Sequence, residues 1–302
     1  MNKTFLKHIP VMVILTSLIT IFLVGTFFDK QFSELFVRDG YEKNFFGVFV
    51  DIFGVPIFTI PLMVIVTVLY NWFLFSKIKP KTRDRIQRWK LITFWLIVFI
   101  ALTLMTSIPV MRSHNPNYYL LIWVFSTLIY WTLFGYIFWF FNKKDQRQKF
   151  INQEYNLQTL LVMVIFCVGV YFTVFILKII FNRPRPDATL LPNAVKEYQA
   201  WWNISYQNFS LKNESFPSGH VGIAMSLLSI LFLFKNKNWK WWTLTTIISL
   251  VILLIAFGRI IFLKHFITDV TMSMILGVLF YAGAARMLKK NWLKKWEVTK
   301  HG

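Results

Sequence analysis

A polar loop and the apolar runs beside it carry the residues of this chain best suited to chemistry. The segment "SFPSGHVG", residues 215–222, places a serine, a glycine and a histidine where that loop gives way to an apolar run. The loop opens with "NRPRP", and a later junction between two apolar runs contains "KHFITD". Because charge at membrane depth is costly and usually marks a functional site, we expect one at the ends of these runs.

Three cations at the ends of the runs, Lys178, Arg185 and Arg259, suit a reaction at phosphorus. Phosphoryl transfer requires positive charge spread over the non-bridging oxygens. Each arginine can hold two oxygens with its planar fork, while the lysine acts as a compact point charge. Ser218 and Gly219 add a hydroxyl and backbone N–H groups at a predicted helix N-terminus, where the glycine lets an anion come close.

Two histidines supply the proton-active groups that hydrolysis without a metal requires, a nucleophile and an acid. His265 and Asp269 are spaced i, i+4, so in a helix the carboxylate could hold one ring nitrogen protonated and leave the other free to attack. His220, beside the predicted phosphate site, is then the acid. The clustered carboxylates and histidines of a two-metal phosphatase are absent from this pattern, so we expect no metal and no cofactor.

Two more charged residues lie near this group. Arg183 follows Lys178 after only four residues, and we rank it below Arg185 as a secondary contact to phosphate. Asp51 lies within reach of the same side of the membrane, but we interpret it as a helix-start residue.

The elements that position these residues are expected to be membrane helices. Of the 302 residues, 56% are hydrophobic and only 15% are charged, unlike a soluble domain. A span requires about 20 apolar residues. We predict eight spans, near residues 10–28, 47–75, 91–111, 119–141, 157–181, 220–234, 243–263 and 270–288. Asp51, Gly54 and Pro56 predict a bend or re-entrant piece in the second. The first run lacks a small-x-small cleavage site, so we interpret it as an anchor.

The distribution of basic residues predicts the orientation. With eight spans and the N-terminus in the cytoplasm, 22 of the 33 Lys and Arg residues fall in inner loops and in the basic tail. The positive-inside rule therefore favours a cell membrane protein with both termini cytoplasmic and the site on the outer face. We assign the net charge of +20 to anionic lipid headgroups at the inner loops, not to nucleic acid. The sequence does not indicate an oligomeric state.

In order and spacing these residues resemble the three-part signature of the type 2 phosphatidic acid phosphatase (PAP2) superfamily. Six residues separate Lys178 from Arg185-Pro186, and Pro217-Ser218-Gly219-His220 follows; five residues separate Arg259 from His265, and three separate His265 from Asp269. The resemblance covers roughly residues 157–288 and implies an all-α transmembrane bundle with a PAP2-like core in the C-terminal half. The expected organisation is a single membrane domain over 1–302, with N-terminal spans at 1–156, the catalytic core at 157–288 and a basic tail at 289–302.

The resemblance also implies roles. His265 would become phosphohistidine, with Asp269 as its orienting partner and His220 as general acid; the phosphate would be bound by Lys178, Arg185, Ser218, Gly219 and Arg259. One position departs from the signature, because Gly258 stands where the family usually has a serine, so one hydroxyl contact to phosphate is missing.

Three functions fit these features. The favoured one is metal-independent hydrolysis of a membrane lipid phosphate monoester or diphosphate, such as phosphatidic acid, phosphatidylglycerophosphate or a polyprenyl diphosphate. A lipid phosphotransferase would use the same site but pass the phosphoryl group to an alcohol. A non-catalytic transporter or anion-binding membrane protein is the third, although a transporter more naturally places charges in mid-span and has matched broken helices in two halves.

Overall fold

The computed structural model describes residues 9–77, 116–143, 157–204, 215–234 and 236–289, with scattered positions between 93 and 107 and at 146. Every regular element among them is helical. The elements are α2 (Ile9–Glu34), η1 (Tyr41–Lys43), α3 (Phe45–Gly54), η2 (Val55–Phe58), α4 (Thr59–Lys77), α6 (Pro116–Asn142), α8 (Leu157–Phe181), α9 (Pro186–Leu190), α10 (Gly219–Met225), η3 (Ser226–Leu233), α11 (Trp239–Ile261) and α12 (Ile267–Lys289).

Six segments are long and apolar enough to cross a membrane. They are Val11–Glu34, Phe45–Phe73, Tyr119–Asn142, Leu157–Leu190, Trp239–Ile261 and Ile267–Lys289. Large apolar side chains cover their outer faces; Phe27, Phe28 and Leu121, for example, are 75%, 57% and 70% exposed. Such a surface suits lipid and not water, and the protein is a membrane protein of the all-α class.

Two of the eight predicted spans have no counterpart among these six. The run predicted at 220–234 forms the helical segment Gly219–Leu233, which is shorter than the six spans. It combines α10 with the 3₁₀ segment η3. The run predicted at 91–111 lies mostly outside the described residues, as does the basic tail beyond residue 289.

The predicted bend in the second span is confirmed. Helix α3 ends at Gly54, a 3₁₀ turn follows over Val55–Phe58 with Pro56 at its start, and α4 begins at Thr59. Proline removes one backbone N–H donor and clashes with the preceding turn, which explains the break.

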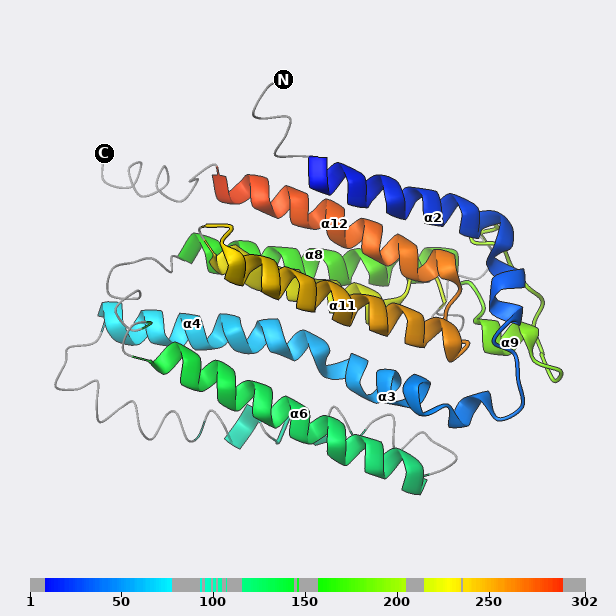
Figure 1. The fold of residues 1–302 in the computed structure, drawn as a ribbon, viewed down its shortest axis with the longest axis horizontal. Helices are drawn as coiled ribbons and strands as arrows, with labels where there is room; N and C mark the ends of the chain where they lie inside the picture. Colours follow the sequence, from blue (N-terminus) through cyan, green and yellow to red (C-terminus); the bar gives the residue numbers. More distant parts are fainter. Residues whose placement is uncertain are drawn as a thin grey trace.

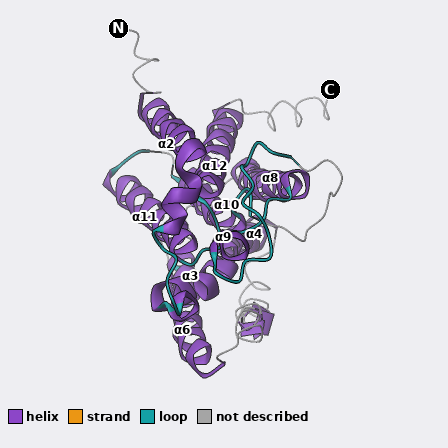
Figure 2. Ribbon diagram, turned by 90° about the vertical axis from the view of Figure 1, so that its right-hand side faces the viewer, coloured by secondary structure: helices purple, strands orange, loops and turns teal. Residues whose placement is uncertain are grey.

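The helices pack along a common direction, with α12 against α2, α8 and α10, and α11 against α3 and α10 (Figure 1). Helix α6 packs against α3 and α4. Helices α8 and α11 end, and α12 begins, at the end of the bundle that carries α9. Figure 2 looks onto this end and shows the loop segments gathered around α8, α9 and α10. The packing therefore brings the polar junctions of the C-terminal half together.

Candidate active site

Backbone hydrogen bonds join the three polar junctions at this end of the bundle. Ser215 N donates to Arg183 O at 3.0 Å, and Ser218 N donates to Asp269 O at 3.0 Å. Asp187 N donates to Leu263 O at 2.9 Å. The segments that contain "NRPRP", "SFPSGH" and "KHFITD" are thus held as one unit, and the eight predicted site residues all lie in it or at its edge.

His265 lies in the turn between α11 and α12 and is only 2% exposed. Its Nδ1 lies 2.7 Å from the carbonyl oxygen of Ser215. Burial, assisted by the positive charges of Lys178 and Arg259, lowers the pKa of His265 to about 3. The imidazole is therefore neutral at neutral pH. A carbonyl only accepts hydrogen bonds, so the proton is on Nδ1 and the Nε2 lone pair remains for attack.

The predicted helical pairing of His265 with Asp269 takes a different form. Helix α12 begins at Ile267, so His265 precedes it, and its Nδ1 is 3.6 Å from Asp269 Oδ2. That distance is too long for a hydrogen bond, and with a neutral imidazole the contact is not an ion pair. The orienting partner in direct contact is the Ser215 carbonyl. The Ser215 hydroxyl also donates to Asp269 Oδ2, so Ser215 links the two residues. A backbone carbonyl carries no residue-type signal, which is why the sequence did not single out Ser215.

Asp269 is fully buried in the first turn of α12 and is held on both oxygens. Its Oδ2 accepts the backbone N–H of Phe266 at 2.8 Å and its Oδ1 accepts Arg183 Nη1 at 2.7 Å. A buried carboxylate requires such partners because transfer out of water is costly. Asp269 is therefore fixed behind the imidazole.

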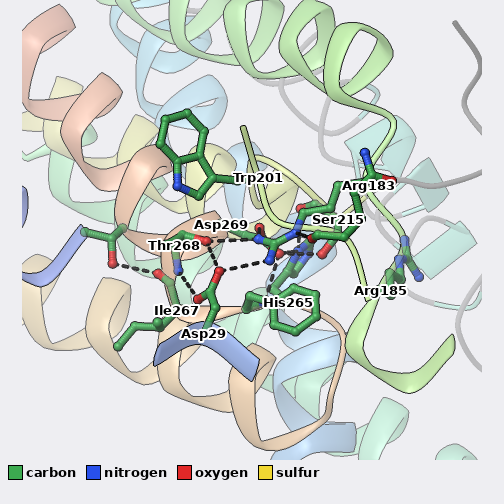
Figure 3. A network of polar contacts seen from close by, with 12 residues as sticks. Asp29, Arg183, Arg185, Trp201, Ser215, His265, Ile267, Thr268 and Asp269 are labelled. Carbon is green, nitrogen blue, oxygen red and sulfur yellow. Dashed lines mark hydrogen bonds and ion pairs between the residues drawn. The ribbon is translucent and has the colours of Figure 1, made fainter. Parts of the chain in front are cut away.

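Arg183 is not available to a phosphate, so its interpretation as a secondary phosphate contact is wrong. Its guanidinium is fully buried, lies over the ring of Phe266 at 4.0 Å from the centroid, and uses all five donors within the protein (Figure 3). The acceptors are Gln199 O at 2.8 Å, Thr268 Oγ1 at 2.9 Å, Asp269 Oδ1 at 2.7 Å, Asp29 Oδ2 at 2.9 Å and Tyr198 Oη at 3.4 Å.

Asp29, a residue of α2 that the sequence interpretation missed, completes this network. It is 1% exposed, pairs with Arg183, and accepts the backbone N–H of Thr268 at 3.0 Å and the hydroxyl of the same residue. Figure 3 shows Asp29 and Asp269 on two sides of the Arg183 guanidinium. The available signal was an acidic residue at the end of the first apolar run, in "FFDKQF".

Three of the predicted site residues have a buried polar atom without a hydrogen-bond partner among the described residues. These atoms are Ser218 Oγ, His220 Nε2 and Arg259 Nε. Buried polar groups are nearly always satisfied in native proteins, so these three atoms are available to water or to a polar ligand.

The two remaining cations border the same atoms. A Cβ on Gly219 would lie 3.3 Å from Lys178 Cε, so the lysine side chain passes directly beside the glycine. Arg185 is the residue before α9 and lies within electrostatic reach of His220 and Arg259. Lys178 is therefore beside Gly219, and Arg185 is on the same side of the site as His220 and Arg259.

Asp51 also reaches this place, and its interpretation as a helix-start residue is wrong. The N-cap of α3 is Asn44, whose side chain accepts the N–H of Gly47, and Asp51 lies two turns further on. Its Oδ1 pairs with Arg259 Nη1 and lies 3.8 Å from His220 Nε2. The sequence shows only that Asp51 is near the predicted outer face of the membrane. The packing of α3 against α11 directs its side chain toward Arg259 and His220.

Close packing of α3 against α11 explains the departure at Gly258. A Cβ there would lie 2.5 Å from Val50 Cγ2, and a Cβ on Gly54 would lie 2.9 Å from His220 Cδ2. Val50 thus occupies the volume that a side chain at position 258 would need. The glycine therefore allows α3, which carries Asp51, to pack close to α11, which carries Arg259.

Among the described residues, no group of three or more His, Cys, Asp or Glu side chains is arranged to hold a metal ion. The arrangement instead offers a neutral imidazole nucleophile, a second histidine and several cations. Groups of these kinds can attack a phosphorus atom, donate a proton and neutralise phosphate oxygens.

Comparison with family models matches residues 156–293 to the PAP2 superfamily. No curated protein and no solved structure matches the chain significantly. PAP2 proteins are in general phosphatases, so the match supports the same coarse activity here, hydrolysis of a phosphoric ester. Over these residues, a little under half of the chain, the match confirms the resemblance to the PAP2 superfamily.

Proposed function

We propose that the protein hydrolyses a lipid phosphate monoester or diphosphate, without a metal, through a phosphohistidine on His265. The observation that carries this proposal is the state of His265: a buried, neutral imidazole whose Nδ1–H donates to the Ser215 carbonyl, so that the lone pair is on Nε2. The same site contains three buried polar atoms without a hydrogen-bond partner among the described residues: Ser218 Oγ, His220 Nε2 and Arg259 Nε. That combination supports attack on a bound phosphate.

In the first step, the phosphate lies among Lys178, Arg185, Ser218, Gly219 and Arg259, which neutralise its oxygens. His265 Nε2 donates its lone pair to phosphorus, and the bond from phosphorus to the leaving oxygen breaks. Burial and the charge of Arg259 hold the pKa of His220 well below its ordinary value, so His220 takes up the proton of the bound phosphate before it acts as the acid. It then gives this proton to the leaving oxygen, so the alcohol or phosphate departs protonated. The ring of His265, now bonded to phosphorus at Nε2 and to a proton at Nδ1, carries a positive charge next to Asp269.

In the second step, His220 takes a proton from water as the water oxygen attacks phosphorus. The N–P bond breaks, its electron pair returns to Nε2, and inorganic phosphate leaves with the proton that His220 took up. Both histidines are restored to their starting states, so no metal-bound hydroxide is needed at either step.

The location of the site at one end of the transmembrane bundle supports a lipid substrate. It lies at one end of a bundle whose helices α8, α11 and α12 are spans covered by exposed apolar side chains. A lipid in the bilayer presents its phosphate at that level while its chains stay among the helices. Since most basic residues are expected on the cytoplasmic side, the proposed substrate is in the outer leaflet, and the basic loops contact anionic headgroups of the inner leaflet.

Exchange of ¹⁸O between labelled inorganic phosphate and water tests the covalent step without knowledge of the lipid. Formation of phosphohistidine from phosphate expels water, and its hydrolysis introduces a solvent oxygen. The full-length protein in detergent should catalyse exchange in the presence of EDTA, and His265→Ala should abolish it while remaining folded. Exchange by His265→Ala within tenfold of the wild-type rate would refute the nucleophile.

A panel of lipid phosphates then defines the reaction. Release of inorganic phosphate from a monoester or diphosphate is the expected result. Transfer to an added alcohol with no phosphate release would instead identify a transferase. Phosphate binding without any exchange would identify a non-catalytic anion-binding protein.

A further inference from the structure

The network behind His265 contains one charged residue from outside the PAP2 segment. Asp29 belongs to α2, far before residue 156, where the match begins, and it contacts Arg183 across 154 positions of sequence. It is as deeply buried as Asp269. A buried carboxylate in an apolar helix requires a reason, because its desolvation is costly.

The charges of the network do not cancel. Two carboxylates, Asp29 and Asp269, share one guanidinium, Arg183, with contacts of 2.9 Å and 2.7 Å. The buried group as a whole therefore carries one negative charge. If Asp29 were neutral, Arg183 would compensate Asp269 completely, and no net negative charge would remain behind the imidazole.

This excess charge lies where the proposed reaction develops positive charge. Asp269 Oδ2 is 3.6 Å from His265 Nδ1, and the imidazole ring becomes cationic when Nε2 bonds to phosphorus. Coulombic interactions are strong in a site shielded from water, so one unit of charge at this distance matters more than it would on a surface.

Asp29 also holds the geometry. It accepts the backbone N–H and the hydroxyl of Thr268, the residue before Asp269, and so fixes the first turn of α12. The Thr268 hydroxyl in turn accepts Arg183 Nη1 at 2.9 Å. Asp29, Arg183 and Thr268 thus form a frame around Asp269.

We propose that Asp29 is a positioning residue of the PAP2 site: it offsets the charge of Arg183, so that the Asp269 carboxylate remains available to stabilise the phosphorylated imidazole of His265. This inference rests on the proposed phosphohistidine mechanism. It assigns to α2 a part in catalysis, in addition to its packing against α12.

The test uses phosphate–water ¹⁸O exchange by the full-length protein, together with the affinity for vanadate. Asp29→Asn keeps the shape of the side chain and removes its charge. We expect the exchange rate at saturating phosphate to fall by about 10- to 100-fold. Vanadate affinity should stay within about threefold of wild type, because no phosphate ligand is altered. Asp39→Asn, the same change at an exposed position after α2, is the matched control and should leave both quantities unchanged.

A second variant separates charge from structure. Asp29→Asn/Arg183→Gln removes both partners and restores the single negative charge on Asp269, so its exchange rate should exceed that of Asp29→Asn alone. A purely structural role predicts the reverse, because the double variant loses more hydrogen bonds. If Asp29→Asn does not fold, the double variant decides alone: exchange above a tenth of the wild-type rate supports the charge account, and a lower rate overturns it.

The remaining outcomes are distinct. Unchanged exchange by folded Asp29→Asn would overturn the inference. An equal loss of exchange rate and of vanadate affinity would also overturn it. Both results would leave the proposed function intact. Absence of exchange in the wild-type protein would refute the phosphohistidine mechanism itself.

Discussion

Replacement of Gly258 tests whether α3 lies as close to α11 as the structure shows. In Gly258→Ala the added Cβ would lie 2.5 Å from Val50 Cγ2, 2.8 Å from its Cβ and 3.0 Å from its Cγ1. Val50 is 2% exposed in the main core and cannot turn away freely. Overpacking of this kind destabilises by about 1–3 kcal/mol. Alanine recovers about 1 kcal/mol relative to glycine through helix propensity. The expected net loss is about 1 kcal/mol.

Unfolding in detergent, followed by circular dichroism against denaturant, measures this loss. Val50→Ala removes the two Cγ contacts, so in the double variant the effect of Gly258→Ala should be smaller than in the wild-type background by about 1 kcal/mol. Gly135→Ala in α6 is the matched control, because its added Cβ meets nothing within 4 Å and should stabilise the helix. If Gly258→Ala is as stabilising as Gly135→Ala, α3 and α11 are not in this contact.

Three further predictions concern the site and its orientation. Asp51→Asn should lower the vanadate concentration for half-inhibition by about tenfold, since the guanidinium now paired with this carboxylate becomes available to the oxyanion; unchanged or weaker inhibition would contradict this. Because burial lowers the pKa of His265 from 6.5 to about 3, protonation favours the unfolded chain between these values. The free energy of unfolding should therefore decrease as the pH falls from 6.5 to 3, and in His265→Asn this decrease should be smaller; parallel curves would be the contrary result. Cysteines at the exposed positions Val195 and Asn236, with Cys167 changed to serine, should react with an impermeant maleimide on intact cells at the first position only; the reverse would place the site in the cytoplasm.

The sequence was most informative where a signal is local. The spacing of Lys178, Arg185, His220, Arg259 and His265 is a property of short segments at the ends of apolar runs, and these residues do come to one end of the bundle. The proline and glycine that break the second span likewise act on their own turn of helix. Patterns of this kind can be recognised in the sequence without knowledge of how the helices pack.

Contacts between distant segments left no such signal. Asp29 meets Arg183 across 154 positions, and Asp51 meets Arg259 across 208. Each depends on the rotation of a whole helix about its axis, which apolar runs exposed on most faces do not define. The sequence predicts a phosphate contact at Arg183 for the same reason, because the spacing of this residue does not reveal that its donors are used within the protein.

The two acidic residues from the N-terminal helices share a physical role. Arg183 and Arg259 are buried cations of the PAP2 segment, 0% and 2% exposed, and loss of a partner from a buried pair destabilises by about 3–5 kcal/mol. Asp29 compensates the first and Asp51 the second, each from a helix that precedes residue 156. The two pairs differ in consequence, because Arg183 has no donor left for a ligand, whereas Arg259 has a free Nε beside the unpaired atoms of the site. A phosphate can therefore compete with Asp51 but not with Asp29. We therefore expect substitutions in α3 at Asp51 to change the affinity of the site for anions, and substitutions in α2 at Asp29 to change the reactivity of His265.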